Sequence, residues 1–209
     1  MTYQQEIKDP FIWVNDNVVP TNLCDEIVQR FEKYKNYHQQ GCIGKGIDTQ
    51  IKDSKDLQIS DWLEFRDISL ILDKTLNDEL YNYREHCEKT TRKSFVTGEE
   101  LPLIIPMPKI YQLSHQVQKT SPTKGYTWHS DALVGRILSY IFYLNDVEEG
   151  WTEFWQGDKV APKKGRLLIF PADRTYYHQG YPPKQDKYIS IGWLTAYQNP
   201  EELSIVNPA

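Results

Sequence analysis

The chain has 209 residues, 39% of them hydrophobic and 13% aromatic, which is enough for one domain with a substantial core. A formal net charge of −5 argues against nucleic acid as the primary partner. The three cysteines are odd in number and far apart, and the sequence shows neither a membrane-spanning apolar run nor a secretory signal. We therefore expect a cytoplasmic protein with reduced thiols and no membrane partner.

The first ninety residues are expected to be mostly helical. Residues 11–18 suggest a short strand, which ends at Pro20. Thr21 can cap a helix that runs to about Tyr37, with an apolar face made by Leu23, Ile27, Phe31 and Tyr34. A second helix is predicted over residues 63–89, and its apolar face would pack on a sheet through Ile68, Ile71, Leu72, Leu76, Leu80, Tyr83 and Cys87.

Between these helices, residues 39–60 are polar and include three glycines, Gly41, Gly44 and Gly46. This composition predicts a long loop. Loops of this length are often functional, so the segment is either an ordinary surface connection or a lid over a substrate.

Strand patterns dominate from Leu103 onward. The expected strands are residues 109–119, 138–145, 165–171 and 187–194, and the last three are apolar enough to be buried. A turn at residues 122–125 would lead into a further strand that carries the first candidate metal ligands.

Three candidate ligands lie at strand ends or in the loops beside them. His129 and Asp131 form an H-x-D triplet, and residues i and i+2 of a strand point to the same side. His178 follows 49 residues later. Two imidazoles and one carboxylate on one face of a metal are the ligand set of non-haem Fe(II) oxygenases. A lone H-x-D triplet also arises by chance, as a surface histidine beside a solvated aspartate, but the neighbouring buried strands favour a metal site.

The segments around these residues resemble the catalytic core of the prolyl 4-hydroxylase-like family of Fe(II)/2-oxoglutarate oxygenases. The resemblance runs from about Met107 to Leu194 and rests on YTWHSD, SYIFYLNDVEEGWTEF, KKGRLLIFPADRTYYHQG and KYISIGWL, in the family's order and spacing. It is strongest toward small microbial and phage members, so the cytoplasm in which the protein acts could be that of a phage's host.

The resemblance implies a mainly β fold with flanking helices. A double-stranded β-helix (jelly-roll) core would span about residues 103–197, with the helices of residues 20–90 packed on its major sheet. It also implies a dioxygenase that uses Fe(II), 2-oxoglutarate and O2, with ascorbate as the reductant and succinate and CO2 as co-products. The iron would be held by His129, Asp131 and His178. The expected substrate is a peptidyl side chain, with proline as the best single guess.

The resemblance further implies that Lys187 anchors 2-oxoglutarate with help from Tyr143, and that Trp193 lies close to the iron. A compact ammonium suits a grip on one buried carboxylate. In the alternative interpretation, Lys187 lies at the end of its strand and extends into solvent, and Tyr143 and Trp193 only pack in the core. Lys119 occupies the position at which better-known relatives often have a tyrosine that binds the co-substrate. With a longer loop in this chain, Tyr111 could bind the co-substrate instead.

The other histidines, His38, His86 and His115, are interpreted as hydrogen-bonded structural residues. His115 shares a strand face with Tyr111 and Lys119 and could line the barrel.

Three other functions compete with a peptidyl hydroxylase. The same iron core could hydroxylate a free amino acid or another small molecule, because a fold does not determine a substrate. A jelly-roll binding module without turnover would have no need of Lys187. A zinc hydrolase could use the same ligands, but the sequence offers no evident general base for it.

Overall fold

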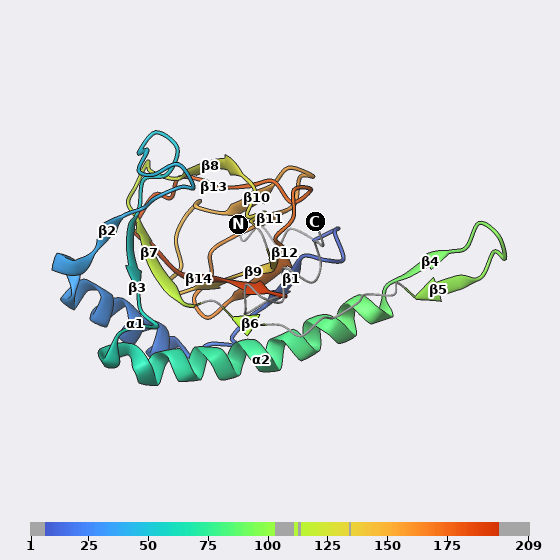
Figure 1. Ribbon diagram of the computed structural model, residues 1–209, viewed down its shortest axis with the longest axis horizontal. Helices are drawn as coiled ribbons and strands as arrows, with labels where there is room; N and C mark the ends of the chain where they lie inside the picture. Colours follow the sequence, from blue (N-terminus) through green and yellow to red (C-terminus); the bar gives the residue numbers. More distant parts are fainter. Residues whose placement is uncertain (1–6, 103–110, 113, 134, 197–209) are drawn as a thin grey trace, which may run out of the picture.

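The computed structural model describes residues 7–102, 111–112, 114–133 and 135–196, and two antiparallel sheets form most of it (Figure 1). The larger sheet has the strand order β1 (Trp13–Asn15), β12 (Leu167–Pro171), β9 (Arg136–Tyr143), β14 (Lys187–Thr195), β7 (Gln116–Thr120), β3 (Lys55–Gln58), β2 (Gln39–Gln40), with β6 (Tyr111–Gln112) also paired to β14. The smaller sheet has the order β11 (Lys159–Val160), β10 (Thr152–Phe154), β13 (His178–Gly180), β8 (Tyr126–His129). From β7 onward the chain passes back and forth between the two sheets, which is consistent with a jelly roll.

Both predicted helices are present, and they lie on the same side of the barrel (Figure 1). Helix α1 spans Thr21–Lys33 and α2 spans Arg66–Lys89, each next to a short 3-10 turn, at Lys35–Tyr37 and Leu63–Phe65. Beyond the barrel, α2 leads into a protruding hairpin of β4 (Thr91–Lys93) and β5 (Glu100–Pro102).

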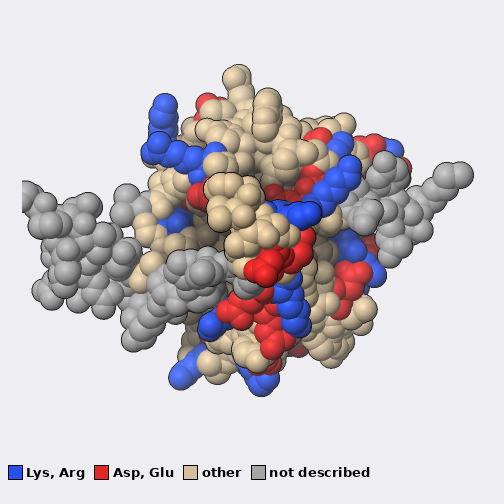
Figure 2. All heavy atoms as spheres, turned by 90° about the vertical axis from the view of Figure 1, so that its right-hand side faces the viewer, with Lys and Arg blue, Asp and Glu red and all other residues tan. Residues whose placement is uncertain are grey.

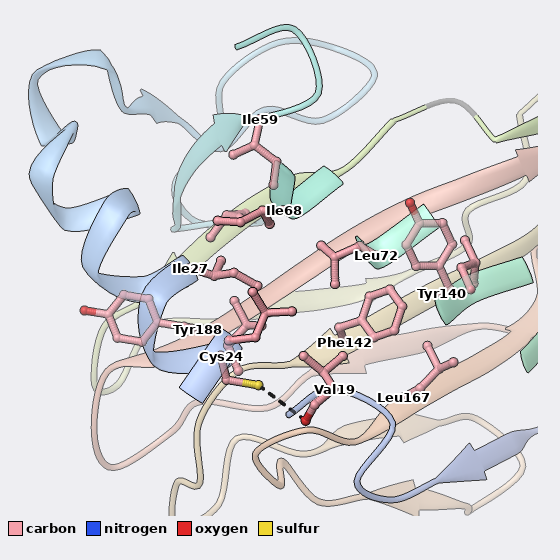
Figure 3. Packing of buried hydrophobic residues seen from close by; sticks show 14 of the residues in the cluster. Val19, Cys24, Ile27, Ile59, Ile68, Leu72, Tyr140, Phe142, Leu167 and Tyr188 are labelled. Atoms are coloured by element: carbon pink, nitrogen blue, oxygen red, sulfur yellow. Dashed lines mark hydrogen bonds between the residues drawn. The ribbon is translucent and has the colours of Figure 1, made fainter. Parts of the chain in front are cut away.

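The central strands β9 and β14 separate two packing environments, because successive side chains of a strand point to opposite faces. On one face, Phe142 of β9 gathers with Leu167 of β12 and with Ile27, Ile68 and Leu72 from the two helices (Figure 3). Full burial of one such side chain contributes about 1.5–3 kcal/mol. On the other face, a second cluster forms inside the barrel around Ile141, Tyr143, Phe154, Phe170 and Ile189.

The start and end of the first helix differ from the prediction. Thr21 does not cap it; Pro20 occupies the cap position, and no side chain makes a capping hydrogen bond. The Pro20 carbonyl already accepts the first helical hydrogen bond from the Cys24 N–H, at 3.1 Å, so Thr21 lies inside the helix. The regular helix ends at Lys33 rather than near Tyr37.

The prediction of one long loop over residues 39–60 is wrong in part. Its two ends form β2 and β3, and only residues 41–54 connect them. The sequence does not predict β3 as a strand, because Asp56, on the face of β3 that points into the barrel, is polar although it is buried. A strand whose inner face lines a polar cavity lacks the apolar alternation that identifies strands in a sequence.

The strand predicted over residues 109–119 is interrupted. It consists of β6 and β7 with a break at Ser114–His115, and residues 109–110 and 113 lie outside the described part of the chain.

On the face seen in Figure 2, acidic and basic side chains lie next to each other. Exposed pairs on α2, such as Lys74–Asp78 and Arg84–Glu88, stabilise the helix by only about 0.3–0.5 kcal/mol each. Within the described ranges, no helix combines the length and the apolar character needed to cross a membrane.

Candidate metal centre

Strands β8 and β13 bring the two predicted histidine ligands together. His129 and His178 are direct partners in the antiparallel pairing, and their ring centroids lie 4.2 Å apart. Asp131 Oδ1 lies 3.7 Å from His129 Nε2, and Oδ2 lies 3.9 Å from His178 Nε2. Ligand atoms from all three residues lie within 4.8 Å of one another. Metal bonds to nitrogen and oxygen are about 2.0–2.2 Å long, so one ion could bind all three after small side-chain adjustments.

The backbone orients both imidazoles toward this centre. His129 Nδ1 lies 2.8 Å from the Thr127 carbonyl oxygen, and His178 Nδ1 lies 3.1 Å from the Tyr176 carbonyl oxygen. A carbonyl oxygen can only accept a hydrogen bond, so each Nδ1 carries the proton. Each Nε2 then keeps its lone pair for a metal, the usual arrangement around ligating histidines.

The protonation states also suit a metal. Burial and the neighbouring His178 lower the pKa of His129 to about 3, so its imidazole is neutral at neutral pH. Burial by itself raises the pKa of the Asp131 carboxyl. The two histidines, together with hydrogen bonds from Ser139 and Trp193, outweigh that effect and hold the pKa below its usual value. A neutral imidazole and an ionised carboxylate are the forms that bind metals.

Lys187 lies inside the barrel and is only 4% exposed, so it does not reach solvent. Its Nζ donates to the Gly150 carbonyl at 2.9 Å, and among the described residues it makes no ion pair with a carboxylate. Burial lowers the pKa of Lys187 to about 8. Gly150 permits this contact because its φ is +67°, and an added Cβ there would lie 3.3 Å from Lys187 Cδ. An unpaired buried cation is costly, so the site favours an anion beside Lys187.

Tyr143 lies one layer behind the cavity wall. It is fully buried, and its hydroxyl lies 2.6 Å from Thr152 Oγ1. Thr152, and not Tyr143, lines the cavity together with Lys187. Sequence reasoning missed Thr152. The available signal was the period-two alternation of β10, in which Thr152 and Phe154 are buried and Glu153 is partly exposed.

Trp193 lines the same cavity, close to the metal centre. Its ring lies 3.7 Å from the guanidinium carbon of Arg136, which is partly buried and makes no ion pair among the described residues. Burial lowers the pKa of Arg136, although a guanidinium stays charged at any physiological pH.

These residues surround a cavity of about 430 Å³. Part of its wall is polar and comes from β3, β7 and the 41–54 connection, through Lys52, Asp56, Gln116, Gln118 and Thr120. Lys52 Nζ donates to Asp56 Oδ2 at 2.7 Å, and Ser54 Oγ donates to Oδ1 at 2.7 Å. Part of the segment predicted as a lid therefore lies at the cavity.

Lys119 lies outside this cavity. It sits on the helix side of the sheet, where its Nζ contacts Glu32 of α1 at 2.9 Å and Asp186 at 3.0 Å. Tyr111 pairs with Thr195, at the opposite end of β14 from Lys187. Lys119 is therefore not brought to the Lys187 ammonium, and the backbone of Tyr111 lies at the far end of that strand.

The remaining histidines have structural partners. His38 and His86 contact the carbonyl oxygens of Phe31 and Pro10, at 2.9 and 3.0 Å. His115 does not line the barrel. Its Nε2 lies 2.9 Å from Asp73 of α2, and its Nδ1 lies 3.0 Å from the Tyr140 hydroxyl. His115 was expected to share a strand face with Tyr111 and Lys119. Because the strand is interrupted before β7, His115 lies outside it and this alternation does not apply.

Residues 115–195 match the family model of the 2OG-Fe(II) oxygenase superfamily. The match contains His129, Asp131, His178 and Lys187. A search of curated proteins found no match.

Several solved structures share the fold. A prolyl hydroxylase from Trichoplax adhaerens, in complex with a hypoxia inducible factor oxygen degradation domain peptide fragment, is 16% identical with a TM-score of 0.66, over 96% of this chain and 88% of that one. The viral collagen prolyl hydroxylase of Paramecium Bursaria Chlorella virus-1, in complex with 2OG, is 19% identical with a TM-score of 0.61, over 90% and 97%. A Pseudomonas putida prolyl-4-hydroxylase is 15% identical with a TM-score of 0.63, over 88% and 92%.

Proposed function

We propose that this chain, whose residues 115–195 match the 2OG-Fe(II) oxygenase superfamily, is a dioxygenase that hydroxylates a peptidyl side chain, with proline as the first candidate. It would consume 2-oxoglutarate and O2, release succinate and CO2, and draw on ascorbate as the reductant. The observation that carries the proposal is that three side chains able to bind a metal and one buried lysine, which makes no ion pair among the described residues, surround the same cavity.

The donor set fits Fe(II). His129, Asp131 and His178 offer two nitrogens and one oxygen from one side, which leaves the other side of an octahedral ion for ligands that come and go. When bound, the iron supplies the activation of O2 toward a substrate C–H bond. The protein's part is to hold the imidazoles in the correct tautomer, keep the carboxylate ionised and exclude bulk water.

Lys187 and Thr152 would bind the far carboxylate of 2-oxoglutarate. The Gly150 carbonyl accepts one of the three N–H bonds of Lys187, so two donors remain for a ligand. Thr152 contributes a hydroxyl whose orientation Tyr143 sets through the 2.6 Å contact. Tyr143 would then assist the co-substrate through Thr152.

A peptide substrate fits the remaining space. A cavity of about 430 Å³ lies in the lower part of the range for small-molecule sites, about 300–1,000 Å³, so it can take the co-substrate and one substrate side chain. The Arg136 guanidinium, stacked on Trp193 without an ion pair among the described residues, can donate to a main-chain carbonyl. A solved structural neighbour, a prolyl hydroxylase, has a peptide bound. Action in a cytoplasm fits the three free cysteines.

A second candidate is a hydroxylase of a free amino acid. The buried Lys52–Asp56 pair and the Gln118 amide on the polar wall could meet both charges of a zwitterion.

One assay separates these candidates. The protein is incubated with Fe(II), ascorbate and labelled 2-oxoglutarate, together with either proline-containing peptides or free amino acids. We expect iron-dependent succinate formation that a peptide stimulates, with a gain of one oxygen atom in that peptide. Stimulation by free amino acids alone would favour the second candidate. An absence of 2-oxoglutarate turnover by iron-loaded protein would contradict both.

A further inference from the structure

The buried hydroxyl of Ser139 lies directly behind the candidate metal ligand Asp131. Ser139 is 2% exposed, and its Oγ donates to Asp131 Oδ2 at 2.7 Å. Neither the sequence motif nor the proposed chemistry explains why a small hydroxyl side chain stands at this buried position of β9. Replacing it with an apolar residue would leave Oδ2 without this partner.

Asp131 needs such a support because it lies outside the regular strands. It follows the end of β8, in a segment where the Ser130 hydroxyl donates to the Asp173 carbonyl and accepts from the Ala132 N–H. Ser139 by contrast belongs to β9 in the larger sheet, where it pairs with Phe170 on one side and Trp193 on the other. The sheet therefore holds the donor rigidly while the acceptor sits on a loop.

The hydrogen bond distinguishes the two oxygens of the carboxylate. Oδ2 accepts the hydrogen bond from Ser139 and lies 3.9 Å from His178 Nε2, whereas Oδ1 lies 3.7 Å from His129 Nε2 and accepts no hydrogen bond from Ser139. A carboxylate can bind a metal through one oxygen or through both. If both oxygens bound, Asp131 would fill a position that the bidentate co-substrate or O2 requires.

We propose that Ser139 is a positioning residue that makes Asp131 a one-oxygen ligand and so keeps half of the coordination sphere open. This inference rests on the proposed function, because it assigns a role to a residue behind one of the three ligands. Partners that hydrogen-bond to ligating side chains typically change metal affinity by about 10–100-fold when they are removed.

The test compares the wild-type protein with S139A, S139T and a matched control, S190A. Ser190 is also a fully buried serine, on the neighbouring strand β14, and its Oγ has no hydrogen-bond partner among the described residues. The affinity of each metal-free protein for Co(II) is measured by calorimetry. The visible absorption of the Co(II) form reports the coordination number, and 2-oxoglutarate is then titrated into that form without O2.

We expect S139A to bind Co(II) about 10–100-fold more weakly, with a changed Co(II) spectrum and at least about tenfold weaker 2-oxoglutarate binding. S139T retains the hydroxyl and should stay within about threefold of the wild type, as should S190A. If S139A does not fold, as judged by circular dichroism, S139C replaces it, since a thiol has a similar size but is a weak donor.

Wild-type affinities and an unchanged spectrum in the hydroxyl-free variant would overturn the inference. Failure of the wild-type protein itself to bind Co(II) would instead contradict the proposed function, so the two failures are distinguishable.

Discussion

The two faces of β9 and β14 share one backbone but carry opposite chemistry. Toward the helices, Tyr140, Phe142 and Leu194 are buried among apolar neighbours of α1 and α2. Toward the barrel interior, Ser139 and Lys187 are equally buried but bear polar atoms aimed at a cavity. The period of two lets adjacent residues serve stability and chemistry separately. Substitutions on one face should therefore change the stability of the fold, and substitutions on the other should change ligand binding.

The largest effect is expected on the barrel face, at the carboxylate ligand. Asp131→Ala removes the one anionic ligand, and it should abolish iron-dependent decarboxylation of 2-oxoglutarate. The free energy of unfolding of the metal-free protein should fall by about 1–3 kcal/mol, because the buried Ser139 hydroxyl loses its acceptor, so the variant should still fold. Succinate formation and urea unfolding measure the two quantities. Full retained turnover would refute the assignment of Asp131 as a ligand.

The opposite result is expected on the helix face. Leu72 of α2 is fully buried, so Leu72→Ala should lower the free energy of unfolding by about 2–5 kcal/mol. Turnover per folded molecule should not change. Ile71 is a suitable control, since it was predicted to pack on the sheet but is 45% exposed, and Ile71→Ala should cost no more than about 0.5 kcal/mol. Equal losses in the two variants would mean that this face is not a packed core.

Lys187→Ala tests the co-substrate anchor. We expect the Michaelis constant for 2-oxoglutarate to rise more than about tenfold, because removing one member of a buried charge pair costs roughly 2–5 kcal/mol. Steady-state kinetics with varied 2-oxoglutarate measures the change. An unchanged constant would move the anchor to another residue.

The pH dependence of 2-oxoglutarate binding sharpens the same point. Burial lowers the pKa of Lys187 to about 8 when no anion is bound, so the ammonium loses its proton as the pH rises through 8. Binding should therefore weaken by roughly tenfold per pH unit above that value. In Lys187→Arg the side chain stays charged, and this slope should disappear. A calorimetric titration between pH 7 and 9.5 that gave the same slope in both proteins would assign it to another group.

The smallest effect is expected at Tyr143. Because its hydroxyl contacts Thr152 and not the cavity, Tyr143→Phe should raise the Michaelis constant for 2-oxoglutarate by only about 2–10-fold, the value of one hydrogen bond. Thr152→Val should have the larger effect. The reverse order would mean that Tyr143 contacts the co-substrate directly.

Residues that belong to local patterns could be predicted from the sequence. His129 and Asp131 have the spacing of two residues on one side of a strand. The apolar run that begins at Lys187 predicts a buried strand. Helix α2 was equally clear, since its apolar residues recur at helical spacing over 24 residues. For Lys187 and α2 the signal lies within one element, where the periodicity of the chain determines which side chains share a face. Asp131, by contrast, follows the end of β8, so the strand alternation assumed for it does not hold in the structure.

Residues that act through tertiary pairing could not be predicted. Ser139 reaches Asp131 only because the packing of the two sheets brings β9 next to the segment that follows β8. Lys52 and Asp56 come to the cavity from a segment whose sequence is typical of a polar loop. Thr152 depends on the hydroxyl of Tyr143, which belongs to the opposite sheet. Such contacts depend on register and on the packing of the two sheets, neither of which leaves a motif in the sequence.

The most direct test of the account is a crystal structure of the protein soaked with Mn(II) and 2-oxoglutarate in the absence of O2. The account predicts a single anomalous peak within about 2.0–2.3 Å of His129 Nε2, Asp131 Oδ1 and His178 Nε2. The far carboxylate of 2-oxoglutarate should lie on Lys187. A metal bound elsewhere, or side chains splayed beyond bonding distance of one ion, would contradict it.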